Sequence, residues 1–401
     1  MLRRAVRVGA MCLLFACSAN AQFRFERAND ADFIERPKPY SFYSTSRFNR
    51  VEGVFLGTGV RLRPRRAPGF QIFGDVGYGF KNEKAQRVRW AAGVRKDFTN
   101  TNRLSLGATA FRQIYSQDLW FVSVLENSLA GFFLREDFMD FVGRKGGMVY
   151  ADYRFLQQHT VRAEIARYEY EILRANNTWS VFGGGKKFPP NPRPGVSYAG
   201  GLENALRLMA AFDWRDNPVF PFVGWYAEGI IERTGDDFST TGLFLTLKRY
   251  QPTFLDQKLQ AKVMWGSRTG SFAYQHLMSL GGIGNLRGFR EKEFVGNRVL
   301  FGSVTYTFGQ SLFRSVPLHF VPFWDTLALG IFGDAGLAWV ADTADADAGL
   351  FDFGGISLAD LRFDAGVSLV VSEGLLRVDF AKRTDRGNDD WRVTFRILDK
   401  F

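Results

Sequence analysis

Residues 281–308 read GGIGNLRGFREKEFVGNRVLFGSVTYTF, a glycine-rich stretch that continues into an alternating one. From Leu300 to Phe308, apolar side chains or glycine recur at every second position. Period two is the pattern of a β-strand, because successive side chains point to opposite faces. Glycines permit positive φ and close backbone approach. The stretch therefore predicts a tightly folded loop over about 268–297, followed by a strand.

The same alternation recurs over most of residues 51–401. Arginines occupy the opposite parity of several strands, as Arg87 and Arg89 do around Val88 and Trp90, so that face is expected to be wet. The pattern predicts sixteen strands, at a spacing that leaves the ~9–11 residues a tilted membrane strand needs. These candidate strands lie near 54–62, 70–80, 88–95, 104–110, 148–157, 160–173, 179–186, 206–215, 224–233, 242–251, 258–267, 300–308, 327–339, 363–371, 376–380 and 391–397.

Composition points to the same class of protein. The 401 residues include 16% aromatic residues and 42 glycines, which suits strands and tight turns. No window after residue 22 approaches the ~20 apolar residues of a membrane-spanning helix. The expected fold class is all-β: a transmembrane antiparallel β-barrel of sixteen strands, with one long loop entering the lumen. A soluble β-sandwich or propeller is the alternative architecture, but it explains neither apolar outward faces nor export.

The first 21 residues have the features of a signal peptide. Arginines precede an apolar run over Val8–Ala16, and Ala19–Ala21 is an A-x-A cleavage site, so residues 1–21 are expected to be removed. Leu14–Cys17 also fits a lipobox, an alternative that would lipidate Cys17. With cleavage after Ala21, both cysteines leave with the peptide, and the exported chain forms no disulfide.

Two segments interrupt or precede the strand pattern. Residues 22–50 are polar and are expected to form a short, irregular periplasmic lead-in to a barrel domain over 51–401. Residues 119–142 follow a helical period and predict a short amphipathic helix in a connection. This helix could pack at the barrel rim, anchor at the membrane interface or act as a gate.

The formal net charge of +11 is compatible with nucleic acid or with an anionic lipid surface. Export argues against nucleic acid, and Arg63–Arg66 is the densest basic cluster. Outer-membrane lipid is therefore the expected partner surface. Metal clusters and nucleotide motifs are absent from the sequence, so no cofactor is expected. The three histidines (His159, His276 and His319) fall in expected loops or turns, and G-x-S-x-G is absent, so an enzyme is not expected.

Four motifs in order resemble the BamA/TamA superfamily of outer-membrane barrels, also called bacterial surface antigen domains. The run GGIGNLRGF is similar to the family's arginine-glycine-aromatic loop, here Leu286, Arg287, Gly288 and Phe289. The other matching segments are FDWRDN at 212–217 with Pro221 and Gly224, FGDAG at 332–336 with Phe332 and Gly336, and RFDAG at 362–366 with Arg362 and Gly366.

The resemblance implies an anchoring contact inside a bacterial outer-membrane barrel. In the family the loop enters the lumen and its arginine contacts the aspartate of the F-x-D-x-G strand. This maps onto Arg287 and Asp334. Phe401 fits the terminal aromatic residue that is read during barrel assembly. Charge complementarity supports the pairing, because a shielded arginine needs an anionic partner.

The family's assembly factors carry periplasmic POTRA domains, for which residues 22–50 are too few. The chain therefore resembles a barrel-only member, and a periplasmic or membrane partner protein is expected to replace the POTRA function. The leading functional hypothesis is insertion or translocation of outer-membrane proteins or lipids. The alternative is a passive pore or structural barrel that its inward loop plugs. Client, seam opening and oligomeric state are left open by the residues.

Overall fold

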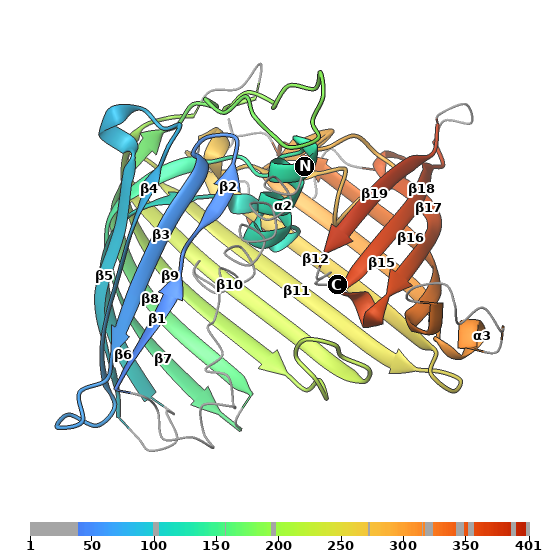
Figure 1. Ribbon diagram of the computed structural model, residues 1–401, viewed down its shortest axis with the longest axis horizontal. Coiled ribbons are helices and arrows are strands. Elements are labelled where there is room, and N and C mark those ends of the chain that lie inside the picture. The colour runs from blue at the N-terminus through green and yellow to red at the C-terminus, as the bar shows by residue number, and fades with distance from the viewer. Residues whose placement is uncertain are drawn as a thin grey trace, which may run out of the picture. The chain divides into compact units, whose positions relative to one another are not determined.

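The computed structural model describes residues 39–98, 104–156, 158–193, 198–271, 273–314, 316, 324–341, 349–351, 357–385 and 390–397. The signal peptide, the lipobox alternative at Cys17, His319 and Phe401 lie outside the described residues. The chain divides into two compact units, and Figure 1 shows their elements. Unit 1 comprises residues 1–154 and 163–206, and unit 2 comprises 155–162 and 207–401. The strands β8 and β9 contribute residues to both units.

Unit 1 is an antiparallel run of strands in which β3 to β7 pair with their sequence neighbours. The elements of this part of the chain are β1 (Tyr40–Ser44), β2 (Arg47–Asn49), β3 (Gly53–Leu62), β4 (Phe70–Gly79), η2 (Lys84–Gln86), β5 (Val88–Asp97), β6 (Leu104–Tyr115), η3 (Gln117–Trp120), α2 (Val124–Leu134), β7 (Val142–Phe155), β8 (His159–Ile172) and β9 (Gly201–Asp213).

Unit 2 continues with antiparallel neighbours from β10 to β12 and from β15 to β19. Its elements are β10 (Gly224–Asp236), β11 (Thr240–Pro252), β12 (Lys258–Gly270), η4 (Tyr274–His276), β13 (Met278–Leu280), β14 (Phe294–Gly296), β15 (Arg298–Phe308), α3 (Ser311–Arg314), η5 (Trp324–Thr326), β16 (Leu327–Trp339), η6 (Leu358–Asp360), β17 (Arg362–Val371), η7 (Ser372–Gly374), β18 (Leu376–Arg383) and β19 (Arg392–Ile397).

The strand count agrees with the sequence, although one strand is a different segment. β1 and β2 pair with β3 in one continuous register, from Tyr40 opposite Leu62 to Asn49 opposite Gly53. Within the described residues the larger sheet has seventeen strands, and counting β1 and β2 as one strand reduces this number to sixteen. Residues 40–49, expected to be irregular, therefore form a strand, because β3 offers them a complete row of backbone partners.

The strand predicted over 179–186 does not form. Its backbone instead caps a helix: Val181 N–H donates to Phe132 O and Phe182 N–H donates to Phe133 O, each at 2.8 Å. The last carbonyl groups of a helix have no partner within it, so an adjacent segment can satisfy them. The apolar side chains in this segment alternate in sequence, but they pack on α2 rather than on a neighbouring strand.

The predicted helix forms over a shorter range than residues 119–142. α2 begins after Ser123, whose hydroxyl accepts a hydrogen bond from Glu126 N–H, and ends at Arg135 in the left-handed conformation. Its buried face is mostly polar or small, with Glu126, Asn127, Ser128, Gly131 and Phe132. Phe132 meets Phe48 of β2 edge to face, with ring centroids 5.4 Å apart. The helix therefore packs on β2 within unit 1.

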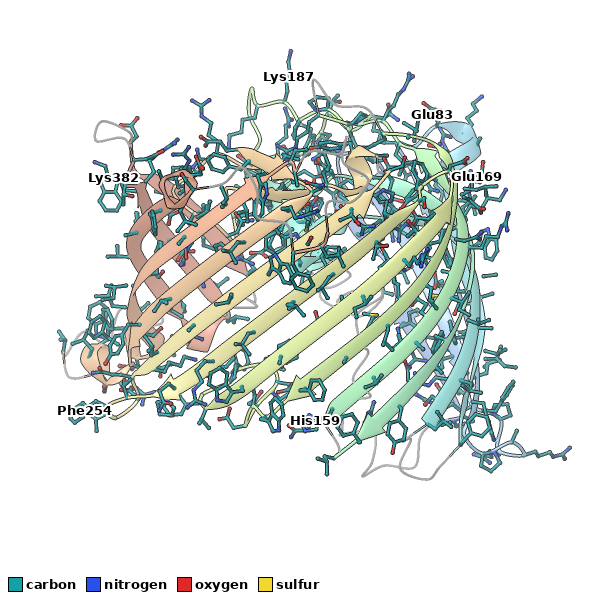
Figure 2. All side chains as sticks on the ribbon, turned by 180° about the vertical axis from the view of Figure 1, so that it is seen from behind. Glu83, His159, Glu169, Lys187, Phe254 and Lys382 are labelled. Carbon is teal, nitrogen blue, oxygen red and sulfur yellow. The ribbon has the colours of Figure 1, made fainter. Side chains whose placement is uncertain are left out.

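Side chains alternate between an exposed apolar face and a buried polar face, as predicted. In β5, Val88 and Trp90 are exposed while Arg89 is buried. Ion pairs satisfy the polar face: Glu171 of β8 binds Arg89 of β5 at 2.7 Å and Arg112 of β6 at 2.8 Å. The carboxylate reaches them past Gly143 of β7, where a Cβ atom would lie 2.8 Å from Glu171 Oε2. Figure 2 shows side chains on both faces of the strands.

The two ends of the strands differ in their connections. In unit 1, the connections over 116–141 and 173–200 are long, whereas those over 63–69 and 98–103, at the opposite end of the strands, are short. In unit 2, Lys382 and Phe254 mark opposite ends of the strands (Figure 2). No helix in the described part of the chain is both long and apolar enough to span a membrane.

Candidate functional site: the arginine loop and its acidic anchor

The glycine-rich loop of unit 2 spans 271–297, between β12 and β15. Its two arms form a small sheet, in which Met278 of β13 pairs with Gly296 of β14 and Leu280 pairs with Phe294. At the tip, Gly281 has a φ of +113°, and a Cβ atom there would lie 2.3 Å from Arg290 O. Glycine is required at this position both for the backbone conformation and for the close approach.

The residues at the loop tip are almost completely buried. Leu286 and Phe289 have 0% of their surface exposed, and Arg287 has 2%. The turn is closed by Gly282 N–H, which donates to Leu286 O at 2.9 Å, and by Gly281 N–H, which donates to Asn285 Oδ1 at 2.7 Å. The loop tip therefore presents the Arg287 cation in a buried position on a hydrogen-bonded turn.

Arg287 forms a two-pronged ion pair with Asp334 of β16. Nε donates to Oδ2 at 2.7 Å and Nη2 donates to Oδ1 at 2.8 Å. A second carboxylate, that of Asp379 on β18, accepts from Nη1 at 3.4 Å, and the Ser303 hydroxyl of β15 accepts from Nη2 at the same distance. The planar guanidinium matches a carboxylate in this geometry, so the contact fixes orientation as well as charge.

The aromatic ring of Phe332 packs against the Arg287 guanidinium. The Arg287 Cζ atom lies 3.3 Å from the centroid of the Phe332 ring, which is a close cation–π contact. The ring can lie flat over β17 because its cross-strand neighbour is Gly366. A Cβ atom at Gly366 would lie 2.6 Å from Phe332 Cζ and 2.0 Å from Phe380 O. The phenylalanine and the two strand motifs thus build one platform for the arginine.

Gly288 brings the loop backbone against β17 and β18. Its N–H donates to Asp364 Oδ2 at 3.0 Å. A Cβ atom at Gly288 would lie 2.8 Å from both Asp364 Cβ and Arg383 N, and these positions belong to paired strands. Any larger residue must therefore displace the loop tip. Gly336 has a similar role on β16, since its Cβ would lie 3.0 Å from Leu280 Cδ1 and 3.3 Å from Leu286 Cδ1.

A second arginine holds the outgoing arm of the loop. Arg383 of β18 stacks on Phe289, with Cζ 4.3 Å from the ring centroid, and its Nη1 lies 3.1 Å from Glu293 Oε1. The loop is thus anchored by two ion pairs. In one, the loop supplies the cation, Arg287, to a carboxylate of β16; in the other, it supplies the carboxylate, Glu293, to an arginine of β18.

Burial alone would lower the pKa of Arg287, but Asp334, followed by Asp379 and Asp364, raises it overall. Arg287 therefore stays charged. Asp379 also accepts from Arg377 Nε at 3.0 Å. Asp334 and Asp364 are direct cross-strand partners, so two carboxylates of the polar face meet at the loop tip.

A family model described as the Omp85 superfamily domain matches residues 103–398 of the chain. The chain belongs to the Omp85 superfamily. The segments that resemble the family's motifs come together in the structure: the loop arginine contacts the strand aspartate, and glycines leave room for the close packing around them. A comparison with proteins of curated function found no match.

The fold is also that of a solved structure of low sequence identity. BamA from Haemophilus ducreyi lacking POTRA domains 1–3 is 14% identical, with a TM-score of 0.58, and the match covers 89% of this chain and 69% of that one. CdiB from Acinetobacter baumannii is 11% identical with a TM-score of 0.43, covering 89% of this chain and 58% of that one. This Omp85 chain is an outer-membrane antiparallel β-barrel with a long loop against its polar face.

The structure brings together most of the predicted site residues in this Omp85 barrel. Leu286, Arg287, Gly288, Phe289, Asp334, Phe332, Gly336 and Gly366 surround the loop tip. Arg362 lies further out, with Cζ 6.0 Å from the Phe294 ring centroid. Asp364, Asp379, Arg383 and Glu293 were not predicted. The sequence contained a signal for Asp364, because this residue lies at a polar position in the alternation of β17, and Asp334 lies at such a position in β16.

Two further predictions can be placed in unit 2. The aspartates and the asparagine of FDWRDN hold a turn together. Asp213 binds Arg215 at 2.8 Å. Asp216 accepts a hydrogen bond from Phe222 N–H at 3.0 Å, and Asn217 accepts one from Val219 N–H at 2.8 Å. His159, expected in a loop, begins β8, where its Nδ1 accepts from Asp213 N–H at 3.0 Å. No cluster of metal-binding side chains occurs among the residues described.

The described part of unit 1 contains a comparable polar anchor. Arg50, at the β2–β3 turn, has 0% of its surface exposed. Its Nη1 donates to Asp137 O at 3.1 Å, and its Nη2 binds Asp140 and donates to Asn191 Oδ1 at 3.3 Å. Asn191 in turn donates to Leu173 O at 2.7 Å. One arginine therefore ties together the two long connections of this unit.

Proposed function

We propose that this barrel assists the insertion or translocation of proteins or lipids at the outer membrane. The observation that carries the proposal is the bidentate contact of Arg287 with Asp334, which holds a whole loop against the polar face of β16 to β18. A buried ion pair contributes little net stability but defines one arrangement sharply. Such a contact suits a loop whose position has to be specified for activity.

The proposal includes a separate periplasmic or membrane protein that delivers the client. A separate deliverer would leave the barrel with the insertion step itself. Co-purification of the full chain with a specific periplasmic or membrane protein supports this part. Efficient client handling by the barrel alone contradicts it.

The loop geometry also favours a second candidate, a passive or structural barrel that the loop plugs. The tip residues Leu286 and Phe289 are fully buried, and two arginine contacts hold the arms, as expected of a permanent plug. The two candidates differ in what happens when the anchor is removed. If the loop is a plug, its release leaves a larger conducting pore. If the loop is needed for insertion, its release leaves a barrel that no longer handles its clients.

The deciding experiment combines depletion, reconstitution and conductance. Depletion of the protein should lower the amounts of other outer-membrane barrels, and liposomes that contain it should accelerate the folding of an added client barrel. Arg287→Ala should abolish the acceleration, and Lys187→Ala, an exposed charge far along the chain, serves as the control. Unchanged client levels and unchanged client folding would remove the insertion proposal. Large, steady pores formed by Arg287→Ala in planar bilayers without any partner, but not by the unaltered protein, would favour the plugged barrel.

A further inference from the structure

The turn between β3 and β4, residues 63–69, is a well-ordered basic projection of unit 1 (Figure 1, lower left). Arg63 N–H donates to Pro39 O at 2.7 Å, and Ala67 N–H donates to Pro64 O at 3.1 Å. Gly69 O accepts from Asp97 N–H at 2.8 Å. These backbone contacts hold the turn to the neighbouring strands at both ends.

The turn concentrates positive charge without any acidic residue of its own. Arg65 and Arg66 are exposed and Arg63 is half-buried, and no carboxylate within the described ranges pairs with any of the three. Lys96 adds a fourth cation, because its Nζ donates to Pro68 O at 2.7 Å. The nearby acid Asp97 is buried, and its carboxylate is already bound by Arg95 at 2.8 Å.

The basic turn lies directly beyond an exposed apolar row. Tyr40, Leu62, Ile72 and Val94 are cross-strand neighbours on four strands, and they are 57%, 41%, 41% and 40% exposed. Phe42 of β1 is 74% exposed and meets Tyr40 edge to face at 6.0 Å. Exposed aromatic residues at the end of an apolar band are typical of the membrane interface of a barrel.

Connection lengths indicate which leaflet this end faces. Bacterial outer-membrane barrels have short turns on the periplasmic side and longer loops on the other. Residues 63–69 lie at the same end of unit 1 as the short connection over 98–103, between β5 and β6, whereas 116–141 and 173–200 lie at the other end. The basic turn is therefore expected at the height of the periplasmic-leaflet headgroups.

We propose that Arg63, Arg65 and Arg66, with Lys96, form a binding site for anionic phospholipid headgroups of the periplasmic leaflet. The apolar row takes the acyl chains, and the guanidinium groups, just beyond it, bind the phosphates, for which arginine is well suited. Each basic residue at an anionic membrane surface strengthens association by about fivefold, equivalent to ~1 kcal/mol. The site selects lipids by headgroup charge and is independent of the loop at Arg287.

The test compares two triple variants of the full chain, reconstituted in phosphatidylcholine vesicles. The first is Arg63→Gln with Arg65→Gln and Arg66→Gln. The matched control is Lys84→Gln with Arg174→Gln and Lys187→Gln, three exposed cations at the other end of unit 1. Spin-labelled phosphatidylglycerol and spin-labelled phosphatidylcholine, added in turn, report the fraction of lipid that the protein immobilises.

We expect the unaltered protein and the control to prefer phosphatidylglycerol by about fivefold or more at low salt. The preference should fall towards one in the arginine variant, and also when salt screens the charges of the unaltered protein. An arginine variant that keeps the full preference overturns the proposal. If that variant does not fold, the single change Arg65→Gln at an exposed position provides the comparison.

An acidic segment of a partner protein could recognise the same charges. Soluble poly-glutamate, added to the protein in uncharged detergent, tests this occupant. Binding of poly-glutamate that requires the three arginines, without any phosphatidylglycerol preference in vesicles, would overturn the lipid site in favour of a protein site.

Discussion

The Arg287 guanidinium and the Asp334 carboxylate meet through two parallel hydrogen bonds, of 2.7 and 2.8 Å, although 47 positions separate them in the chain. Phe332, two residues before Asp334, lies beneath the same guanidinium at 3.3 Å. A single strand thus supplies both the counter-charge and the stacking surface. The loop position consequently depends on the shape of the cation as well as on its charge.

Arg287→Lys should therefore release the loop although it keeps the positive charge. Lysine can neither form two parallel hydrogen bonds to Asp334 nor stack a planar group on Phe332. The protection of the loop from protease in this variant should therefore lie between that of the unaltered protein and that of Arg287→Ala. Removing one partner of a buried pair costs about 3–5 kcal/mol, and we expect Arg287→Ala to approach this loss in loop anchoring. Limited proteolysis of 271–297 in the folded barrel measures it. Equal protection of all three proteins would contradict the anchoring role.

Gly288→Ala should dislodge the loop tip without touching any charge. The new Cβ would lie 2.8 Å from Arg383 N and Asp364 Cβ, in paired strands that cannot move aside. We expect a loss of about 1–3 kcal/mol, as for other overpacked sites, and increased cleavage of the loop. Gly185→Ala is the control, because nothing lies within 4 Å of a Cβ there. If both variants behave alike, the close approach of Gly288 is not what positions the tip.

Arg50→Gln should loosen both long connections of unit 1 together. The side chain binds Asp137 and Asn191 from different connections, and its loss leaves the buried Asp137 carboxylate without its cation. We expect about 3–5 kcal/mol of destabilisation, with hydrogen exchange rising in 116–141 and 173–193 at once. Arg174→Gln, at an exposed position in the second connection, should leave both protected. Exchange that rises in only one connection would show that Arg50 does not couple them.

The β2–β3 turn should weaken in acid through Glu52. Burial would raise the pKa of Glu52, but Arg47, at 2.6 Å, together with Arg89 and Asn49, lowers it below its ordinary value of 4.5. A lowered pKa in the folded state means that the carboxylate stabilises the fold above about pH 4.5, and that this contribution is lost as the pH falls further. Urea unfolding in detergent from pH 7 to pH 3 should show the loss. Glu52→Gln should be less stable at pH 7 and should lack this part of the acid response.

The strand pattern made most of the fold predictable. Exposed Val88 and Trp90 around buried Arg89 show why, since period two separates the lipid face from the polar face before any pairing is known. The prediction failed where local contacts replaced sheet pairing. Trp179 and Val181 recur at period two as in a strand, yet the N–H groups of Val181 and Phe182 donate to carbonyl groups at the end of α2. Tyr40–Asn49 looked irregular because polar residues interrupt it, yet β3 pairs with it throughout.

For the candidate site, the sequence by itself determined the chemistry of the anchor. The resemblance of the loop motif and of FGDAG to the family implied that Arg287 pairs with Asp334, and the opposite charges of the two side chains supported the pairing. Only the tertiary structure decided which other groups take part. Asp364, Asp379 and Arg383 reach the loop because strand register sets them beside it. Register depends on pairing between distant segments, and no local run of residues encodes it.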